Sequence, residues 1–114
     1  MSMESDLLTA MRTVHAASFK FPVKSEQTGV YATYQRITGR RHGTLNSGLG
    51  APVATFQIDV WGKAGGSAIG DVVEALKEAL PDLLKVGDIT DNPDDYETDT
   101  QLHRASFDVT VWER

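Results

Sequence analysis

Apolar residues at helical spacing open the chain. They are Leu7, Leu8, Met11, Val14 and Phe19, and their intervals come close to the three or four residues that bring side chains to one helix face. Ser5 precedes them and can cap the free backbone N–H groups of a first turn. The pattern predicts a helix over about 5–17.

Two later segments alternate between apolar and polar positions, which is typical of strands with one buried face. In the first segment, one face holds Ala54, Phe56, Ile58 and Val60, and the other holds Thr55, Gln57, Asp59 and Trp61. In the second segment, 104–112, the inward positions are Ala105, Phe107, Val109 and Val111, and the outward ones are Arg104, Ser106, Asp108, Thr110 and Trp112. Both segments are predicted to lie in a sheet that helices cover on one face.

Three further elements complete the predicted order. Residues 30–38 are rich in β-branched and aromatic side chains and predict a strand, and 86–90 predict a short one. Between them an amphipathic helix is predicted from Ser67 to about Leu80, where Pro81 ends its regular part, and 82–85 could add another turn. The sequence thus predicts an α+β fold class: a two-layer domain with about four strands in the order α-β-β-α-β-β and helices on one sheet face.

Two segments between these elements lack a pattern of buried positions. Residues 39–52 hold four glycines and one proline, and 91–103 open with an acidic run that includes Asp94 and Asp95. Both are predicted to be flexible surface loops. Because 114 residues can bury one modest core, residues 1–114 are predicted to form a single domain.

Charge is distributed unevenly along the chain. The formal net charge is −5 and the pI is near 5.0, which argues against non-specific binding of nucleic acid. Residues 1–63 hold seven basic and four acidic residues, a net +3, whereas 64–114 hold four basic and twelve acidic residues, a net −8. An asymmetry of this kind indicates that charge helps to select a partner.

Composition also indicates where in the cell the protein is located. The chain has no cysteine, which excludes disulfides and thiolate metal sites. No apolar run approaches the ~18 residues of a membrane span, and the first residues carry acids where a secretory signal carries bases. The sequence therefore predicts a soluble, unexported protein without a membrane partner.

No motif for a cofactor, a metal or a nucleophile is complete. The glycine-rich segment 43–48 lacks the lysine of a phosphate loop, and 48–50 lacks the third glycine of a dinucleotide-binding turn. The three histidines do not have the spacing of metal ligands, and the acidic segment 91–99 lacks the glycine and closing glutamate of a calcium loop. We therefore expect no cofactor and no metal site.

Two carboxylates are the best candidates for catalysis. Asp59 and Asp108 lie on the polar faces of strands predicted to be neighbours, where a carboxylate pair can act as general acid and base. Alternation alone also places acids on a wet face, and the pattern predicts none of the apolar surroundings that a general acid needs. We therefore expect a protein that is not an enzyme.

Side chains suited to contacts with other proteins are more prominent. Trp61 and Trp112 fall among polar residues, where a tryptophan either anchors an interface or packs over a strand end of its own chain. Arg40 and Arg41 are predicted in the glycine-rich loop, where they either meet phosphate or a neighbour's acids or stay solvated. The candidate interface residues are Arg40, Arg41, Trp61, Asp94, Asp95 and Trp112.

The order of these segments resembles that of a known family. The chain has an N-terminal helix, the strand YATYQRITG over 31–39, a glycine-rich loop, the strand FQIDVW over 56–61, an amphipathic helix and the closing strand FDVTVW over 107–112. Nearly the whole chain in this order resembles the tail completion, or tail terminator, family of long-tailed bacteriophages and prophages. The matching motifs are patterns of strand composition, not catalytic signatures. The segments 15–29 and 91–103 depart from the family pattern.

The resemblance implies a structural protein of the virion. Such a subunit forms a ring, usually a hexamer, that terminates the tail tube and connects it to the head. The implied partners are further copies of the chain, the tail tube protein and a head–tail connector protein, and DNA passes through the lumen without specific binding. The implied location is the head-proximal end of the tail, and the host cytoplasm during assembly.

Two other functions remain open from the sequence. A small ligand-binding or regulatory α+β module that uses the open sheet face is favoured if Trp61 and Trp112 line an apolar groove. An enzyme is favoured if a pocket converges on Asp59 and Asp108.

Overall fold

One sheet and two helices make up the computed structural model, which describes residues 3–22, 29–41, 52–62, 67–97 and 102–112. The elements are α1 (Met3–Val14), β1 (Ser18–Lys20), β2 (Tyr31–Arg41), β3 (Pro52–Gly62), α2 (Ser67–Leu83), β4 (Val86–Glu97) and β5 (Leu102–Trp112). The strand order is β1-β2-β3-β5-β4, and only the pairing of β1 with β2 is parallel. The α+β class is confirmed, with five strands where the pattern predicts about four.

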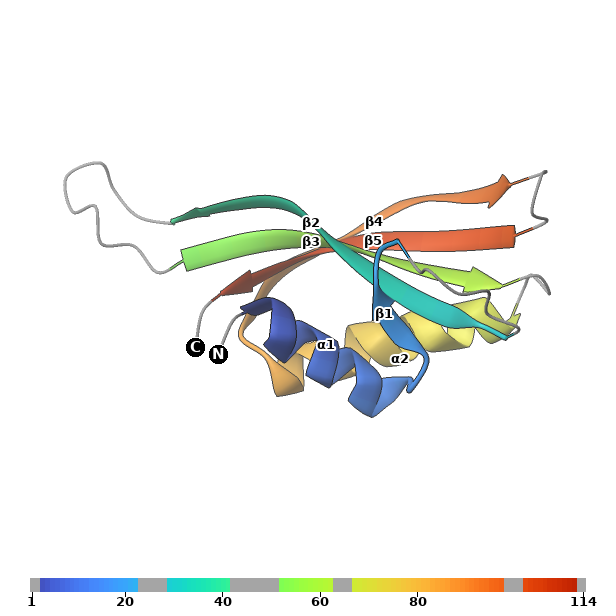
Figure 1. Ribbon diagram of the computed structural model, residues 1–114, viewed down its shortest axis with the longest axis horizontal. Coiled ribbons are helices and arrows are strands. Elements are labelled where there is room, and N and C mark those ends of the chain that lie inside the picture. Colours follow the sequence, from blue (N-terminus) through green and yellow to red (C-terminus); the bar gives the residue numbers. More distant parts are fainter. Residues whose placement is uncertain (1–2, 23–28, 42–51, 63–66, 98–101, 113–114) are drawn as a thin grey trace.

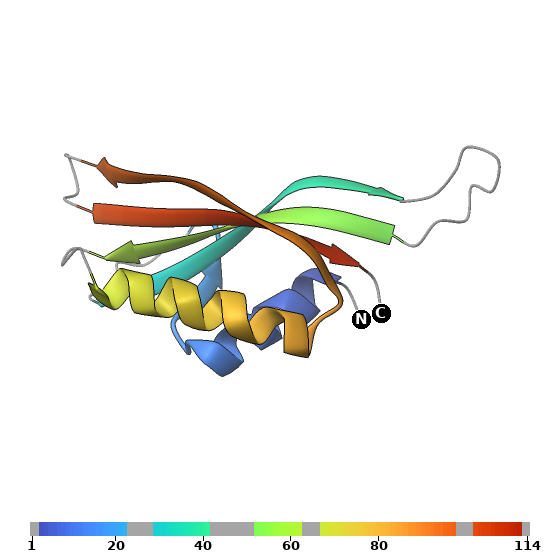
Figure 2. The same cartoon turned by 180° about the vertical axis from the view of Figure 1, so that it is seen from behind.

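Both helices pack on the same face of the sheet and leave the other face open (Figures 1 and 2). The core lies between these two layers. The buried side chains of the central strands are Phe56, Ile58 and Val60 of β3 and Phe107, Val109 and Val111 of β5. The helices contribute Leu7 and Met11 of α1 and Leu76 and Leu80 of α2, each of them fully buried. The apolar faces predicted for the two alternating strands are therefore the faces that pack on the helices.

Helix α2 continues through Pro81 instead of ending before it. A proline removes its own N–H from the helix and crowds the carbonyl four residues before it. Beyond it, the Leu84 N–H still donates to the Leu80 carbonyl at 2.8 Å. Leu84 is buried in the core. The packing of this last turn offsets the missing hydrogen bond.

Helix α1 ends earlier than predicted, and Phe19 lies in β1 instead of on the helix. The Ser18 hydroxyl donates to the His15 carbonyl at 2.7 Å, and Arg12 Nε donates to the Ser18 carbonyl at 3.0 Å. These bonds turn the chain, so that β1 pairs with 32–34 of β2.

Part of the predicted loop 39–52 belongs to a strand. Arg40 and Arg41 continue β2 and pair with Val53 and Pro52 of β3, so the prediction that they project from a loop is wrong. Pairing with a regular neighbouring strand overrides the weak strand preference of this glycine- and arginine-containing stretch. Residues 42–51 lie outside the described residues.

The acidic run is likewise not only a loop. Asp94 and Asp95 lie within β4, which pairs with β5 through residue 97. An edge strand has a neighbour on one side only, so its backbone tolerates the acidic run and even Pro93. The strand is irregular, because its register shifts between Asn92 and Asp95. Residues 98–101 lie outside the described part of the chain.

The Glu4 carboxylate ties α1 to the edge of the sheet. It lies 2.7 Å from Lys20 Nζ and accepts a hydrogen bond from the Tyr34 hydroxyl at 3.3 Å. The hydrogen bond with Lys20 lowers the pKa of the Glu4 carboxyl, and burial raises the pKa of the Tyr34 hydroxyl. Because the folded Glu4 binds a proton less readily than the unfolded one, this contact stabilises the fold above the ordinary carboxyl pKa. The stabilisation is lost as the pH falls through the lowered pKa.

Replacing Lys20 should therefore have a pH-dependent cost. Lys20→Gln is expected to lower the free energy of unfolding by less than ~1 kcal/mol near neutral pH, because the pair is partly exposed. The difference should shrink as the pH falls from neutral toward about 3, because the Glu4 carboxyl takes up its proton as the pH passes through its lowered pKa. Urea unfolding across this pH range measures it. Glu4→Gln should cost about the same, and the double variant should add little. A cost independent of pH would contradict the assignment.

Removing a side chain between the layers should be far more costly. Leu76→Ala is expected to lower the free energy of unfolding by about 3 kcal/mol, because a fully buried leucine leaves a cavity. Glu74→Ala, on the exposed face of the same helix, is the matched control and should change it by less than about 0.5 kcal/mol. Urea unfolding followed by circular dichroism measures both, and equal effects would contradict the packing described.

Candidate functional site

The open face of the sheet carries rows of polar side chains. One row runs across β2, β3, β5 and β4 through Thr33, Asp59, Ser106 and Asn92. Although no helix covers this face, Thr33 and Asp59 are each only 1% exposed. The neighbouring side chains of the same sheet therefore bury them.

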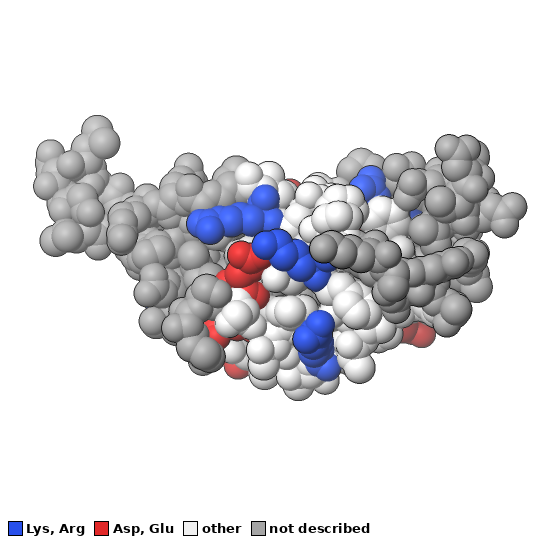
Figure 3. Space-filling model, in the orientation of Figure 1, with Lys and Arg blue, Asp and Glu red and all other residues white. Residues whose placement is uncertain are grey.

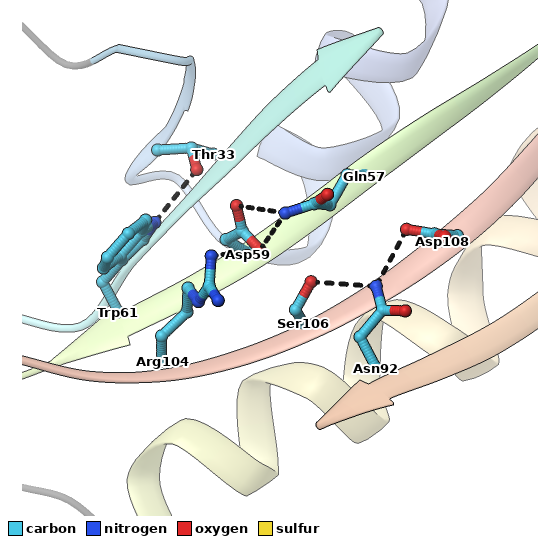
Figure 4. Close-up of polar contacts among 8 residues, drawn as sticks. All are labelled: Thr33, Gln57, Asp59, Trp61, Asn92, Arg104, Ser106 and Asp108. Atoms are coloured by element: carbon cyan, nitrogen blue, oxygen red, sulfur yellow. Dashed lines mark hydrogen bonds and ion pairs between the residues drawn. The ribbon is translucent and has the colours of Figure 1, made fainter. Parts of the chain in front are cut away.

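Trp61 packs against its own chain at one end of this face (Figure 4). Its indole Nε1 donates to the Thr33 hydroxyl at 3.0 Å, and its ring stacks on Tyr31 with centroids 6.2 Å apart. The Arg104 guanidinium lies 5.7 Å from the centre of the indole. Only 8% of Trp61 is exposed. Of the two alternatives for this tryptophan, the structure favours packing within the chain.

Asp59 is held by amide and guanidinium groups from its own sheet. Gln57 Nε2 donates to both carboxylate oxygens, at 3.1 and 3.2 Å, and Arg104 Nη1 lies 4.0 Å from one of them. Arg104 thus connects the buried carboxylate to the Trp61 ring. A buried charge with such partners stabilises one arrangement of side chains, because removing a partner leaves it uncompensated.

Asp108 has a separate set of partners. Asn92 Nδ2 donates to Asp108 Oδ1 at 2.9 Å and to the Ser106 hydroxyl at 3.2 Å (Figure 4). In the sheet register Asp108 lies opposite Gln57, not opposite Asp59. The two candidate carboxylates are therefore diagonal neighbours on the open face, and each has its own hydrogen-bond donors.

Trp112 lies at the other end of the sheet and covers a glycine. A Cβ atom added to Gly87 would lie only 2.9 Å from the Trp112 Nε1 atom, so a larger residue there would displace the indole. Lys85 Nζ lies 5.9 Å from the ring centre, and the ring stays partly exposed. The close approach of the indole explains the glycine in β4.

The six candidate interface residues fall into two groups at opposite ends of the sheet. Trp61 and Asp95 both pair with Arg104, and Asp94 precedes Asp95 in the same strand. At the far end, Val53 pairs with both Arg40 and Trp112, and Arg41 follows Arg40. Arg40 and Arg41 thus lie at one end of the strands, and Asp94 and Asp95 lie at the other end.

Sequence reasoning missed several exposed residues along β1 and β2. The large hydrophobic residues exposed in the described part of the chain are Ile37, at 45%, and Phe21, at 40%. Arg36 is exposed beside Ile37. The break in alternation at Ile37, where the register of β2 shifts, is the signal that could have identified it.

Within the described residues, no group of His, Asp and Glu is arranged to hold a metal ion. The helices there are also too short or too polar to cross a membrane. The fold and its open face define a small α+β protein. The central polar side chains of that face form hydrogen bonds with other side chains of the same sheet.

A family model then identifies the class of protein. The model for tail completion protein gp17 matches residues 6–114, so the chain belongs to this family of phage tail structural proteins. A chain from the "Virion of native gene transfer agent (GTA) particle" has the same fold, with a TM-score of 0.56 and 14% sequence identity over 96% of this chain and 91% of that one. A comparison with curated proteins found no match.

Loss of the Trp61 hydrogen bond should weaken the open face. Thr33→Val keeps the shape of the side chain but removes the acceptor for the buried indole N–H. We expect the free energy of unfolding to fall by about 1–3 kcal/mol. Thr13→Val on the exposed side of α1 is the control and should change it by less than about 0.5 kcal/mol. Urea unfolding measures both, and equal stability of the two variants would contradict the role of this bond.

Proposed function

We propose that the chain is a ring-forming subunit that terminates the tail tube of a phage-like particle and connects it to the head. The observation that carries the proposal is the family match, which extends over 6–114. This range includes the whole sheet, all of α2 and all of α1 except its first three residues. A chain of the same fold in a gene transfer agent virion supports it. The proposed role is non-enzymatic, because the family consists of structural proteins of phage tails.

The proposed partners are those of a ring at the head-proximal end of a tail. Further copies of the chain form the ring, six in the form expected from the family, and the tail tube protein and a connector protein bind its two sides. The ring assembles in the host cytoplasm, and DNA passes through its lumen. The net charge of −5 supports a net acidic lumen in which DNA slides without binding.

Five of the six candidate residues, Arg40, Arg41, Asp94, Asp95 and Trp112, are proposed to lie in contacts with the neighbouring subunit or the tail tube. Trp61 is set apart from them, because it is buried against its own chain. A ring needs a head-to-tail interface, in which two different patches of each subunit meet. Arg40 and Arg41 in β2 lie on a different side and at the opposite end of the sheet from Asp94 and Asp95 in β4, so the two pairs belong to different patches of the subunit. The segment between β2 and β3 is proposed to contact a neighbouring subunit or the tail tube, within a single domain that spans the chain.

A ligand-binding module on the open sheet face has less support. Such a module needs an accessible groove whose polar groups can hydrogen-bond to the ligand. Asp59 and Trp61 are buried there, and their polar atoms already bond to Gln57 and Thr33.

The proposal is tested in a particle that lacks its own copy of this gene. The chain supplied in trans should restore joined heads and tails, counted by negative-stain electron microscopy. Arg40→Glu with Arg41→Glu should reduce joined particles by about tenfold or more, because like charges then meet across the contact. Arg40→Lys with Arg41→Lys keeps the charge and should restore joining.

Two results would count against the proposal. Normal joining without the gene would overturn the function itself. Full activity of the double glutamate variant would overturn the role of the arginines.

A further inference from the structure

The two sides of the sheet carry opposite charge. On one side, α1, β1 and β2 hold five basic and two acidic residues, namely Arg12, Lys20, Arg36, Arg40 and Arg41 against Glu4 and Asp6. On the other side, α2 and β4 hold one basic and nine acidic residues, namely Lys77 against Asp71, Glu74, Glu78, Asp82, Asp88, Asp91, Asp94, Asp95 and Glu97. We name these sets of elements the basic edge (α1, β1 and β2) and the acidic edge (α2 and β4).

The strand order converts a charge difference along the chain into one across the molecule. Strands β3 and β5 occupy the middle, and α1 packs beside β1 whereas α2 packs under β3, β5 and β4. The space-filling view looks onto α1, β1 and β2 and shows several Lys and Arg side chains there, with acidic atoms beside them (Figure 3). Arg12, Lys20 and Arg36 are exposed on this side, and Asp82 and Asp88 are exposed on the other.

Each edge also presents a strand with a free side. Strand β1 pairs only with 32–34 of β2, so 35–41 have no neighbour on that side within the described part of the chain. Strand β4 pairs only with β5. Antiparallel steps across the sheet make β2 and β4 run in opposite directions, so a β2 of one copy beside a β4 of the next is an antiparallel arrangement.

The basic edge carries apolar surface as well as charge. Of the exposed large hydrophobic residues noted above, Ile37 lies in β2 and Phe21 directly follows β1. Apolar side chains surrounded by charged ones are the usual make-up of a protein interface. Arg36, Phe56, Val109 and Ile89 form one row across the sheet, so Ile37 and Asp88 adjoin the two ends of the same row.

We propose that the basic edge of one copy docks on the acidic edge of the next. Each edge repels its own kind and attracts the other, so charge selects a head-to-tail contact over a symmetric one. Pro93 and the register shift in β4 interrupt its free side. Side chains, not one continuous strand ladder, therefore carry the contact. The inference rests on the proposed ring and specifies which surfaces form it.

The absence of cysteine in the chain allows a direct test. Ile37→Cys and Asp88→Cys place one thiol on each edge. Ile37→Cys with Thr13→Cys is the matched control, because both of its thiols lie on the basic edge, which the proposed contact does not bring against itself. Each variant is treated with a flexible bis-maleimide at high protein concentration. The products are separated on a denaturing gel, which also records brief contacts of a monomer.

The double variant Ile37→Cys with Asp88→Cys should give a ladder of trimers and longer species, about tenfold above the control. The 1:1 mixture of the two single variants should stop at the mixed dimer. Adding Lys20→Glu and Arg36→Glu, or raising the salt from about 0.05 M to about 0.5 M, should suppress the ladder.

A single variant that forms its own dimer as readily as the mixture forms the mixed dimer would overturn the head-to-tail contact. A ladder no stronger than the control would overturn it too. The joining assay keeps the two proposals separate. Restored joining without a ladder would support the tail function and overturn this contact. A ladder without restored joining would support the contact and overturn the tail function.

Discussion

The antiparallel pairing of β3 with β5 is the interaction on which the rest of the structure depends. These strands hold most of the buried apolar side chains of the sheet, and both helices pack over that face. Because the helices cover one face only, the other face has no apolar partner. Its central polar groups are buried by one another, and they satisfy their hydrogen bonds within the sheet, as Asp59 does through Gln57.

The elements with a regular period could be predicted from the sequence, and the irregular ones could not. The alternation around Phe56 and Phe107 identifies β3 and β5, because each has one face in the core and one outside it. Strand β4 has no such alternation along its acidic part, and the composition of that part resembles a loop. Strand β1 has only three residues and is defined by the turn after α1, which depends on contacts such as Arg12 with Ser18.

The open face shows a second limit of sequence reasoning. Alternation places Asp59 and Trp61 correctly on the polar side of β3, but polarity does not reveal exposure. Whether Asp59 is buried depends on the register with β2 and β5, which brings Thr33 and Ser106 to either side of it. The burial of Trp61 likewise depends on Tyr31 and Arg104, which belong to segments far from it in the chain.

The acidic composition of β4 also helps to explain the strand order. A sheet in which β4 followed β3 directly would place acids between two strands, and their solvation would then compete with packing on both sides. In the observed order β5 takes that interior position, with Phe107, Val109 and Val111 in the core. The acids stay at the margin, on the side away from the basic strand β2. The segregation of charge that favours head-to-tail docking is thus a consequence of the same burial cost that determines the topology.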